Sequence, residues 1–111
     1  LEQRDKALTC YQKCLQLDPI QTLAYIAIGN IHFDNQNYQT ALLYLEKAYD
    51  LDNEAEDIKL FLSMTHYKLG HFDKAKAFLE QACSEKQNSL NLFLEVCDEA
   101  KQNPVFKSFF Q

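Results

Sequence analysis

Three histidines and four cysteines are the residues of this sequence that could bind a metal ion or act as nucleophiles. They are His32, His66, His71, Cys10, Cys14, Cys83 and Cys97. No Cys-x-x-Cys or His-Glu-x-x-His motif brings such groups to the local spacing of a zinc site. We therefore expect no metal site, no cofactor and no enzymatic activity, and we place the histidines in the core or at its rim.

The cysteines show no pattern of a disulfide framework. Cys10 and Cys14 are four residues apart on an expected helix, where disulfide geometry is awkward. We interpret all four as buried free thiols in a reducing compartment, which places the protein in the cytoplasm. A secreted framework built on the even number of cysteines is the less favoured alternative.

Acidic residues cluster where an expected helix begins. They are Asp50, Asp52, Glu54, Glu56 and Asp57. We expect them to stay solvated near the positive end of that helix, so a catalytic carboxylate pair is not expected. The sequence also has no Gly-rich loop that could hold a phosphate.

Composition excludes further classes of function. The 111 residues are enough for one domain with a modest core. A formal charge of −5, with the eleven Lys and Arg scattered, argues against a nucleic-acid partner. No apolar run approaches the roughly 18 residues of a membrane span, so we expect no membrane insertion.

The helices that position these residues are indicated by residue types that recur every 34 positions. This interval is called the repeat period below. Small residues repeat as Ala7, Ala41 and Ala75 and as Gly29, Ser63 and Cys97, and aromatic residues as Tyr38, Phe72 and Phe106. Several series kept in phase are typical of stacked helical repeats. With few Gly and Pro, the pattern predicts helices over 3–17, 22–34, 38–51, 55–69, 72–85 and 89–101, then a short apolar turn, VFKSFF.

This pattern resembles the tetratricopeptide repeat family, in which an aromatic residue, an aliphatic and a small residue precede Ala, an aromatic residue and Pro. The best match carries Tyr25, Ile28, Gly29 and Ala41; the next repeat has Lys59 in place of the aromatic residue. The resemblance implies an all-α fold, a right-handed α-solenoid of antiparallel helix pairs with about three repeats. In a single domain over 1–111, we expect the second helix of a partial repeat (1–19), two repeats (22–53 and 56–87) and a degenerate or capping repeat (89–111).

The first residue falls in the middle of a repeat, so helix 3–17 lacks its partner. Its apolar residues Leu8, Tyr11, Cys14 and Leu15 would leave part of a helix–helix contact uncovered. We interpret the chain as a fragment of a longer array. The alternative is an intact small protein that forms a homodimer through its exposed end helices.

The resemblance also implies a concave groove lined by the first helix of each repeat. Carried onto this chain, the partner-binding residues are Leu23, Ile26, Asn30, Phe33, Asp57, Leu60, Met64, Tyr67 and Leu94, with Asn91, Asp98 and Lys101 at further positions of the last repeat. Ile26 and Phe61 stand where members that grip a chaperone's C-terminal carboxylate need Lys and Arg, so that subclass is not expected. The groove suits a peptide with apolar anchors, although packing within the core is an open alternative for Ile26, Leu60, Phe33, Met64 and Tyr67.

Two functions remain open from the sequence. The first is a scaffold or adaptor module that binds a peptide segment or a neighbouring subunit. The second is a small chaperone that sequesters an aggregation-prone client, as similar three-repeat proteins of bacterial secretion systems do. In both, the partner is a protein.

Overall fold

The computed structural model describes residues 6–10, 12–13, 21–55 and 57–110. Every regular element within these ranges is helical, as the sequence predicts. The chain forms two compact units, Leu1–Ile58 and Lys59–Gln111, which are described separately below. The expected helix 3–17, and with it most of the partial repeat 1–19, falls largely outside the described residues. None of the helices in the described ranges combines the length and the apolar character that crossing a membrane requires.

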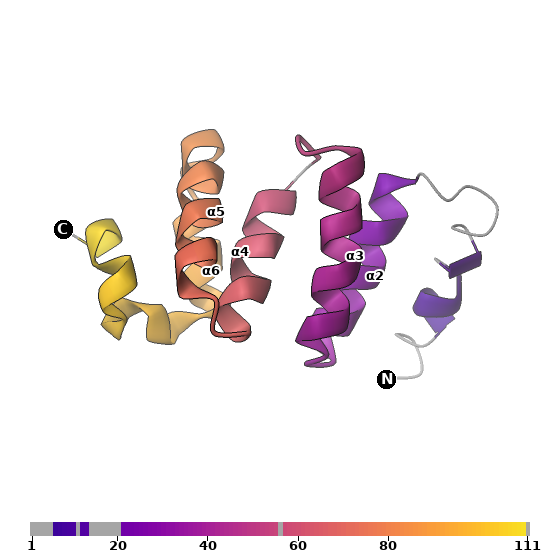
Figure 1. Ribbon diagram of the computed structural model, residues 1–111, viewed down its shortest axis with the longest axis horizontal. Coiled ribbons are helices and arrows are strands. Elements are labelled where there is room, and N and C mark those ends of the chain that lie inside the picture. Colours follow the sequence, from indigo (N-terminus) through magenta and orange to yellow (C-terminus); the bar gives the residue numbers. More distant parts are fainter. Residues whose placement is uncertain (1–5, 11, 14–20, 56, 111) are drawn as a thin grey trace. The chain divides into compact units, whose positions relative to one another are not determined.

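Unit 1 is built on a pair of helices, α2 (Thr22–Asp34) and α3 (Tyr38–Leu51), which lie side by side (Figure 1). Both have the bounds that the sequence predicts. The turn between them, 35–37, is closed by a hydrogen bond of 2.8 Å from the Asn37 amide to the His32 carbonyl oxygen. A connection this short makes the two helices antiparallel.

Gly29 lies where α2 and α3 approach most closely. A Cβ atom at this position would lie 2.8 Å from Cγ of Leu45 and 3.3 Å from the carbonyl oxygen of Ala41. Leu45 and Ala41 are themselves fully buried. Only a glycine therefore fits this crossing point without displacing its neighbours, which confirms the helix-pair register inferred from the repeat.

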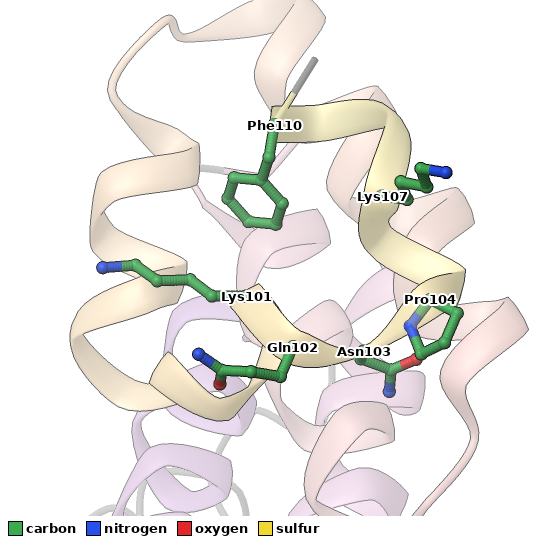
Figure 2. Close-up of a pocket in the computed structure, with 6 residues that line it drawn as sticks. All are labelled: Lys101, Gln102, Asn103, Pro104, Lys107 and Phe110. Carbon is green, nitrogen blue, oxygen red and sulfur yellow. The ribbon is translucent and has the colours of Figure 1, made fainter.

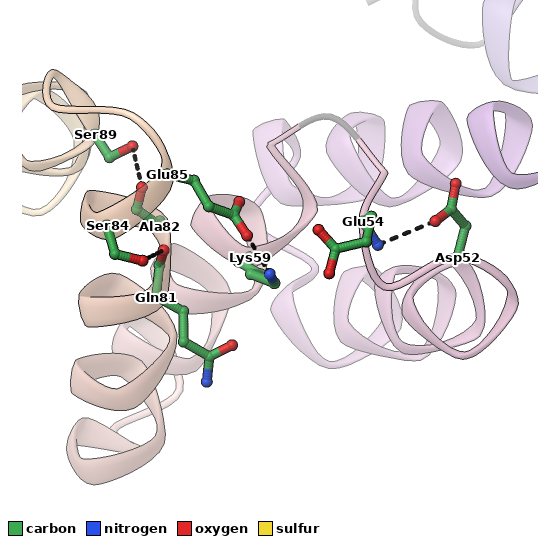
Figure 3. Close-up of polar contacts among 8 residues, drawn as sticks. All are labelled: Asp52, Glu54, Lys59, Gln81, Ala82, Ser84, Glu85 and Ser89. Atoms are coloured by element: carbon green, nitrogen blue, oxygen red, sulfur yellow. Dashed lines mark hydrogen bonds and ion pairs between the residues drawn. The ribbon is translucent and has the colours of Figure 1, made fainter.

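Unit 2 contains α4 (Ile58–Lys68, whose first residue is the last of unit 1), α5 (Phe72–Glu85) and α6 (Ser89–Val96). Two 3-10 helices follow, η1 (Asp98–Gln102) and η2 (Pro104–Phe110). The buried hydroxyl of Ser89 donates a hydrogen bond of 3.2 Å to the Ala82 carbonyl oxygen, which ties the start of α6 to α5 (Figure 3).

The predicted start of the helix at residue 55 is wrong, because α4 begins at Ile58. Asp57 has a φ of 58°, in the left-handed region that a helix cannot pass through. Turn hydrogen bonds from Ala55 to Asp52 and from Ile58 to Ala55 occupy the preceding residues. The first turn of α4 accordingly contains no acidic residue, contrary to expectation. Glu56 lies outside the described residues.

The predicted helix 89–101 is also wrong in its second half, since α6 ends at Val96. The backbone of Cys97 has φ −123° and ψ 56° and leaves the helix, and η1 follows. Beyond the break, Phe106 of η2 packs on Phe93 of α6, with ring centroids 5.6 Å apart. The segment VFKSFF, which the sequence predicts as a short apolar turn, forms most of the 3-10 helix η2.

An aromatic cluster of Tyr67, Phe93 and Phe106 forms the core of unit 2. The ring centroids are 5.7 Å apart for Tyr67 and Phe93, 5.3 Å for Tyr67 and Phe106, and 5.6 Å for Phe93 and Phe106. The two phenylalanines are almost completely buried. Because these rings come from α4, α6 and η2, the cluster holds the 3-10 segment against the helices.

Candidate functional site

The histidines take part in packing that repeats between the two units. The His32 ring stacks on Tyr44 in unit 1, with centroids 5.7 Å apart, and the His66 ring stacks on Phe78 in unit 2, at 5.8 Å. The two histidines are one repeat period apart, and so are the two rings on which they stack. These two imidazoles therefore occupy an aromatic position of the repeat, His66 in the core and the partly exposed His32 at its rim, as expected from the sequence. The same expectation is wrong for His71, which is exposed.

His66 and His71 form a hydrogen-bonded pair, with their Nδ1 atoms 3.1 Å apart. Burial lowers the pKa of His66 to about 4, with smaller contributions from the positive charges of His71 and Lys74. His66 is therefore neutral at pH 7. Within the described ranges no group of three or more His, Cys, Asp or Glu side chains could hold a metal ion.

The cysteines differ in exposure. Cys97 is buried, and burial raises the pKa of its thiol to about 12, which makes it a poor nucleophile. Cys83 is partly buried, and burial raises the pKa of its thiol as well. Cys10 is exposed, so the expectation that all four thiols are buried is wrong for this residue. Cys14 lies outside the described residues.

One face of α2 carries four of the proposed partner-binding residues. They are Leu23, Ile26, Asn30 and Phe33, and this face is called the α2 stripe below. Leu23 is 73% exposed, whereas Ile26 is buried. Asn30 and Phe33 are partly exposed, and the Phe33 ring meets Tyr38 edge to face at 5.1 Å. The α2 stripe is thus accessible at both ends and closed at Ile26.

The corresponding residues of the next repeat are mostly buried. Leu60, Met64 and Tyr67 all lie in the core, and only Asp57 is partly exposed. The Tyr67 ring packs 4.9 Å from the ring of Phe72 in addition to its place in the aromatic cluster. This burial favours the core interpretation of Tyr67 that the sequence left open.

The last repeat presents its residues differently. Leu94 is partly exposed, whereas Asn91, Asp98 and Lys101 are exposed. Asn91 and Leu94 lie on α6, but Asp98 and Lys101 lie on η1, beyond the helix break at Cys97. The four residues therefore do not share one helical face.

The second helix α3 also carries apolar surface, which the sequence pattern did not predict. Leu43 is 60% exposed and Leu51 is 45% exposed. Leu51 also lines a pocket of about 260 Å³ with Tyr25, Lys47 and Asp50. Nζ of Lys47 lies 5.9 Å from the ring centroid of Tyr25, within the range of a cation–π contact.

The matching positions of unit 2 carry polar or small side chains in place of these apolar ones. Lys59 and Glu85, which stand one repeat period after Tyr25 and Leu51, form an ion pair (Figure 3). Leu43 likewise corresponds to the small Ala77. The signal in the sequence is a difference between the two repeats: leucine stands at two second-helix positions of the first repeat, where the second repeat has Ala77 and Glu85.

Comparison with known proteins connects both units to one family. Two sequence profiles described as tetratricopeptide repeat match the chain, one over residues 32–93 and one over residues 1–21. Anaphase-promoting complex subunit 3 of Schizosaccharomyces pombe is 24% identical over 106 residues, covering 90% of this chain and 16% of that protein. Tetratricopeptide repeat protein 6 of Homo sapiens is 32% identical over 63 residues, covering 57% of this chain and 12% of that protein. The chain thus spans less than a fifth of the length of these curated relatives.

Proposed function

The chain belongs to the tetratricopeptide repeat family, and we propose that it is a scaffold or adaptor module that binds a peptide segment or a neighbouring subunit. One relative is, by its name, a subunit of a complex, which favours a role in assembly. The chain matches a small part of each relative, which supports the proposal that it is one module of a longer protein. Helical repeats of this kind present extended surfaces for such contacts.

The observation that carries this proposal is the exposure of Leu23 on the α2 stripe. A leucine that is 73% exposed leaves most of its apolar surface in water. Covering such a side chain contributes roughly 1.5–3 kcal/mol. Phe33, at the other end of the stripe, adds an aromatic ring that is only partly covered. An apolar segment of a partner protein would cover both ends of the stripe.

The experiment compares two leucines of similar exposure on different helices. The chain and its Leu23→Asp and Leu43→Asp variants are immobilised, and proteins retained from an extract of the source cells are quantified by mass spectrometry. We expect Leu23→Asp to lose specific partners that Leu43→Asp retains. Both substitutions add one negative charge to a surface leucine, so charge alone does not explain a difference. Equal retention by both variants would contradict binding at the α2 stripe.

Two measurements together separate the scaffold from a client-sequestering chaperone. A scaffold retains a small set of folded partners in fixed ratios. A chaperone suppresses the aggregation of an unfolded client, which light scattering with the purified chain measures directly.

Sedimentation of the chain over a range of concentrations tests the alternative that the chain forms a homodimer. We also propose a reducing, cytoplasmic location, which imaging of the tagged full-length protein tests.

A further inference from the structure

A second candidate binding site lies in the C-terminal segment of unit 2. Here η1, η2 and the link between them surround an open pocket of about 440 Å³ (Figure 2). The residues that line it are Lys101, Gln102, Asn103, Pro104, Lys107 and Phe110. The Asn103 side-chain oxygen accepts a hydrogen bond of 3.0 Å from the Val105 amide, which braces the link. All the lining residues belong to one unit and to one continuous segment, 101–110.

The charge of this pocket is opposite to that of the chain. Its only charged lining residues are Lys101 and Lys107, whereas the whole chain carries a formal charge of −5. Two other lysines of unit 2 have acidic neighbours: Lys59 pairs with Glu85, and Lys68 lies 3.9 Å from Glu99. Neither pocket lysine has an ion-pair partner among the described residues. Both amines therefore remain available to an anionic group from outside the chain.

The pocket also has an apolar side. Phe110 is 42% exposed, and in Figure 2 its ring points toward the segment that carries Lys101. Pro104 adds a rigid apolar surface to the lining. A ligand that satisfies the whole lining must therefore combine negative charge with an apolar group.

We propose that this pocket binds an acidic peptide segment in which carboxylates flank an apolar side chain. The carboxylates pair with Lys101 and Lys107, and the apolar side chain packs on Phe110. Charge complementarity selects this occupant, because charged groups of opposite sign steer and orient a partner. The negative charge of the chain as a whole disfavours a long polyanion such as a nucleic acid. The site is separate from the α2 stripe and does not depend on the function proposed for it.

The test uses the full chain and the fluorescein-labelled hexapeptide Glu-Asp-Phe-Asp-Glu-Leu as the probe, with binding measured by fluorescence anisotropy. We expect Lys101→Ala and Lys107→Ala each to weaken binding by about fivefold, and the double variant by about 25-fold. Phe110→Ala should weaken binding to a similar degree as one lysine, since it removes the apolar contact. Lys76 lies on α5 and does not line the pocket, so Lys76→Ala should bind as the parent does.

Two further probes distinguish the chemistry. The amide analogue Gln-Asn-Phe-Asn-Gln-Leu keeps the apolar residues and the label and loses the four side-chain charges, so its binding should be at least about 25-fold weaker. Binding of the acidic peptide should weaken as salt is added. The proposal is overturned if the double lysine variant binds the acidic peptide as the parent does, or if the amide analogue binds equally well. Preference for a single-stranded oligonucleotide over the peptide would also overturn it. Circular dichroism of each variant confirms that the fold is retained.

Discussion

The hydroxyl of Ser63 donates a hydrogen bond of 2.7 Å to the main-chain oxygen of Ala75 and so joins α4 to α5. The corresponding pair in unit 1 is Gly29 and Ala41, each one repeat period earlier in the sequence. There a Cβ atom on the glycine would lie 3.3 Å from the Ala41 oxygen. Both units therefore bring a small residue of the first helix onto the same carbonyl group of the second, one by direct approach and one by a hydrogen bond.

Substitution of Gly29 tests this crossing point. Gly29→Ala should gain up to about 1 kcal/mol of helix propensity but lose roughly 1–3 kcal/mol to overpacking against Leu45, which gives a net loss of stability. Gly29→Leu should be worse. Ser63→Ala keeps the volume and removes one hydrogen bond, so we expect a cost of about 1 kcal/mol. Urea unfolding measures all three. A Gly29→Ala variant as stable as the parent would show that the α2–α3 register is wrong.

The turns that follow α2 and α4 provide a second comparison. Gln36 and Gly70 occupy the same turn position in successive repeats, and both have positive φ, 65° and 83°. Gln36→Gly should stabilise the protein by roughly 0.5–1 kcal/mol, because glycine adopts this conformation without strain. Gly70→Ala should destabilise it by about 1 kcal/mol although a Cβ atom there meets no atom within 4 Å. Thermal melts report both shifts, and two changes of the same sign would contradict the argument.

The buried His66 should make stability depend on pH. Burial, with help from His71 and Lys74, lowers its pKa from 6.5 to about 4 in the folded state. Between these values the unfolded chain binds a proton that the folded chain excludes, so stability is lost as the pH falls from about 6.5 to 4. The expected loss is roughly 2–3 kcal/mol. Unfolding free energies measured across this range test the slope.

Two variants isolate the contribution of His66. His66→Phe keeps a ring to stack on Phe78 and removes the titrating group, so its stability should change less between pH 6.5 and 4 than that of the parent. His71→Asn places in unit 2 the residue that unit 1 has at Asn37, and the His66 pKa should then rise toward 6.5 without reaching it. NMR titration of the imidazole protons measures this pKa directly. An unchanged pH slope in His66→Phe would be inconsistent with the proposed origin.

Phe33 and Tyr67 occupy equivalent first-helix positions and should respond differently to truncation. Tyr67 is 6% exposed and part of the aromatic cluster, so Tyr67→Ala should cost roughly 3–5 kcal/mol. Phe33 is only partly buried, and Phe33→Ala should cost less, about 1–2 kcal/mol. Denaturant unfolding gives both values. Because Phe33→Ala should leave the fold largely intact, a loss of partner binding in this variant can be assigned to the binding surface. A loss of stability in Phe33→Ala as large as that in Tyr67→Ala would contradict the different burial of the two rings.

The thiols should differ in reactivity in the native protein. Exposed Cys10 should react quickly with iodoacetamide at neutral pH, whereas buried Cys97, whose pKa is raised to about 12, should react slowly. Mass spectrometry of the digested protein locates the label. In denaturant without reductant we expect four reactive sulfhydryls. Finding two would contradict the reduced, cytoplasmic interpretation.

The repeat period by itself determined the all-helical fold, the bounds of α2, α3 and α5, and the close approach at Gly29. Such features are predictable because hydrophobic periodicity and turn residues act over a few neighbouring positions. The late start of α4 depends on the left-handed backbone of Asp57, which no sequence signal marked.

Only the tertiary structure decided which faces are covered. At equivalent first-helix positions, Asn30 and Phe33 of unit 1 are partly exposed, whereas Met64 and Tyr67 of unit 2 lie in the core. The packing of η2 through Phe106 onto rings of α4 and α6 likewise joins residues that are far apart in the sequence. Exposure is a property of the neighbours that long-range folding brings to a side chain. A local pattern can identify a helical face, but it does not identify what covers that face.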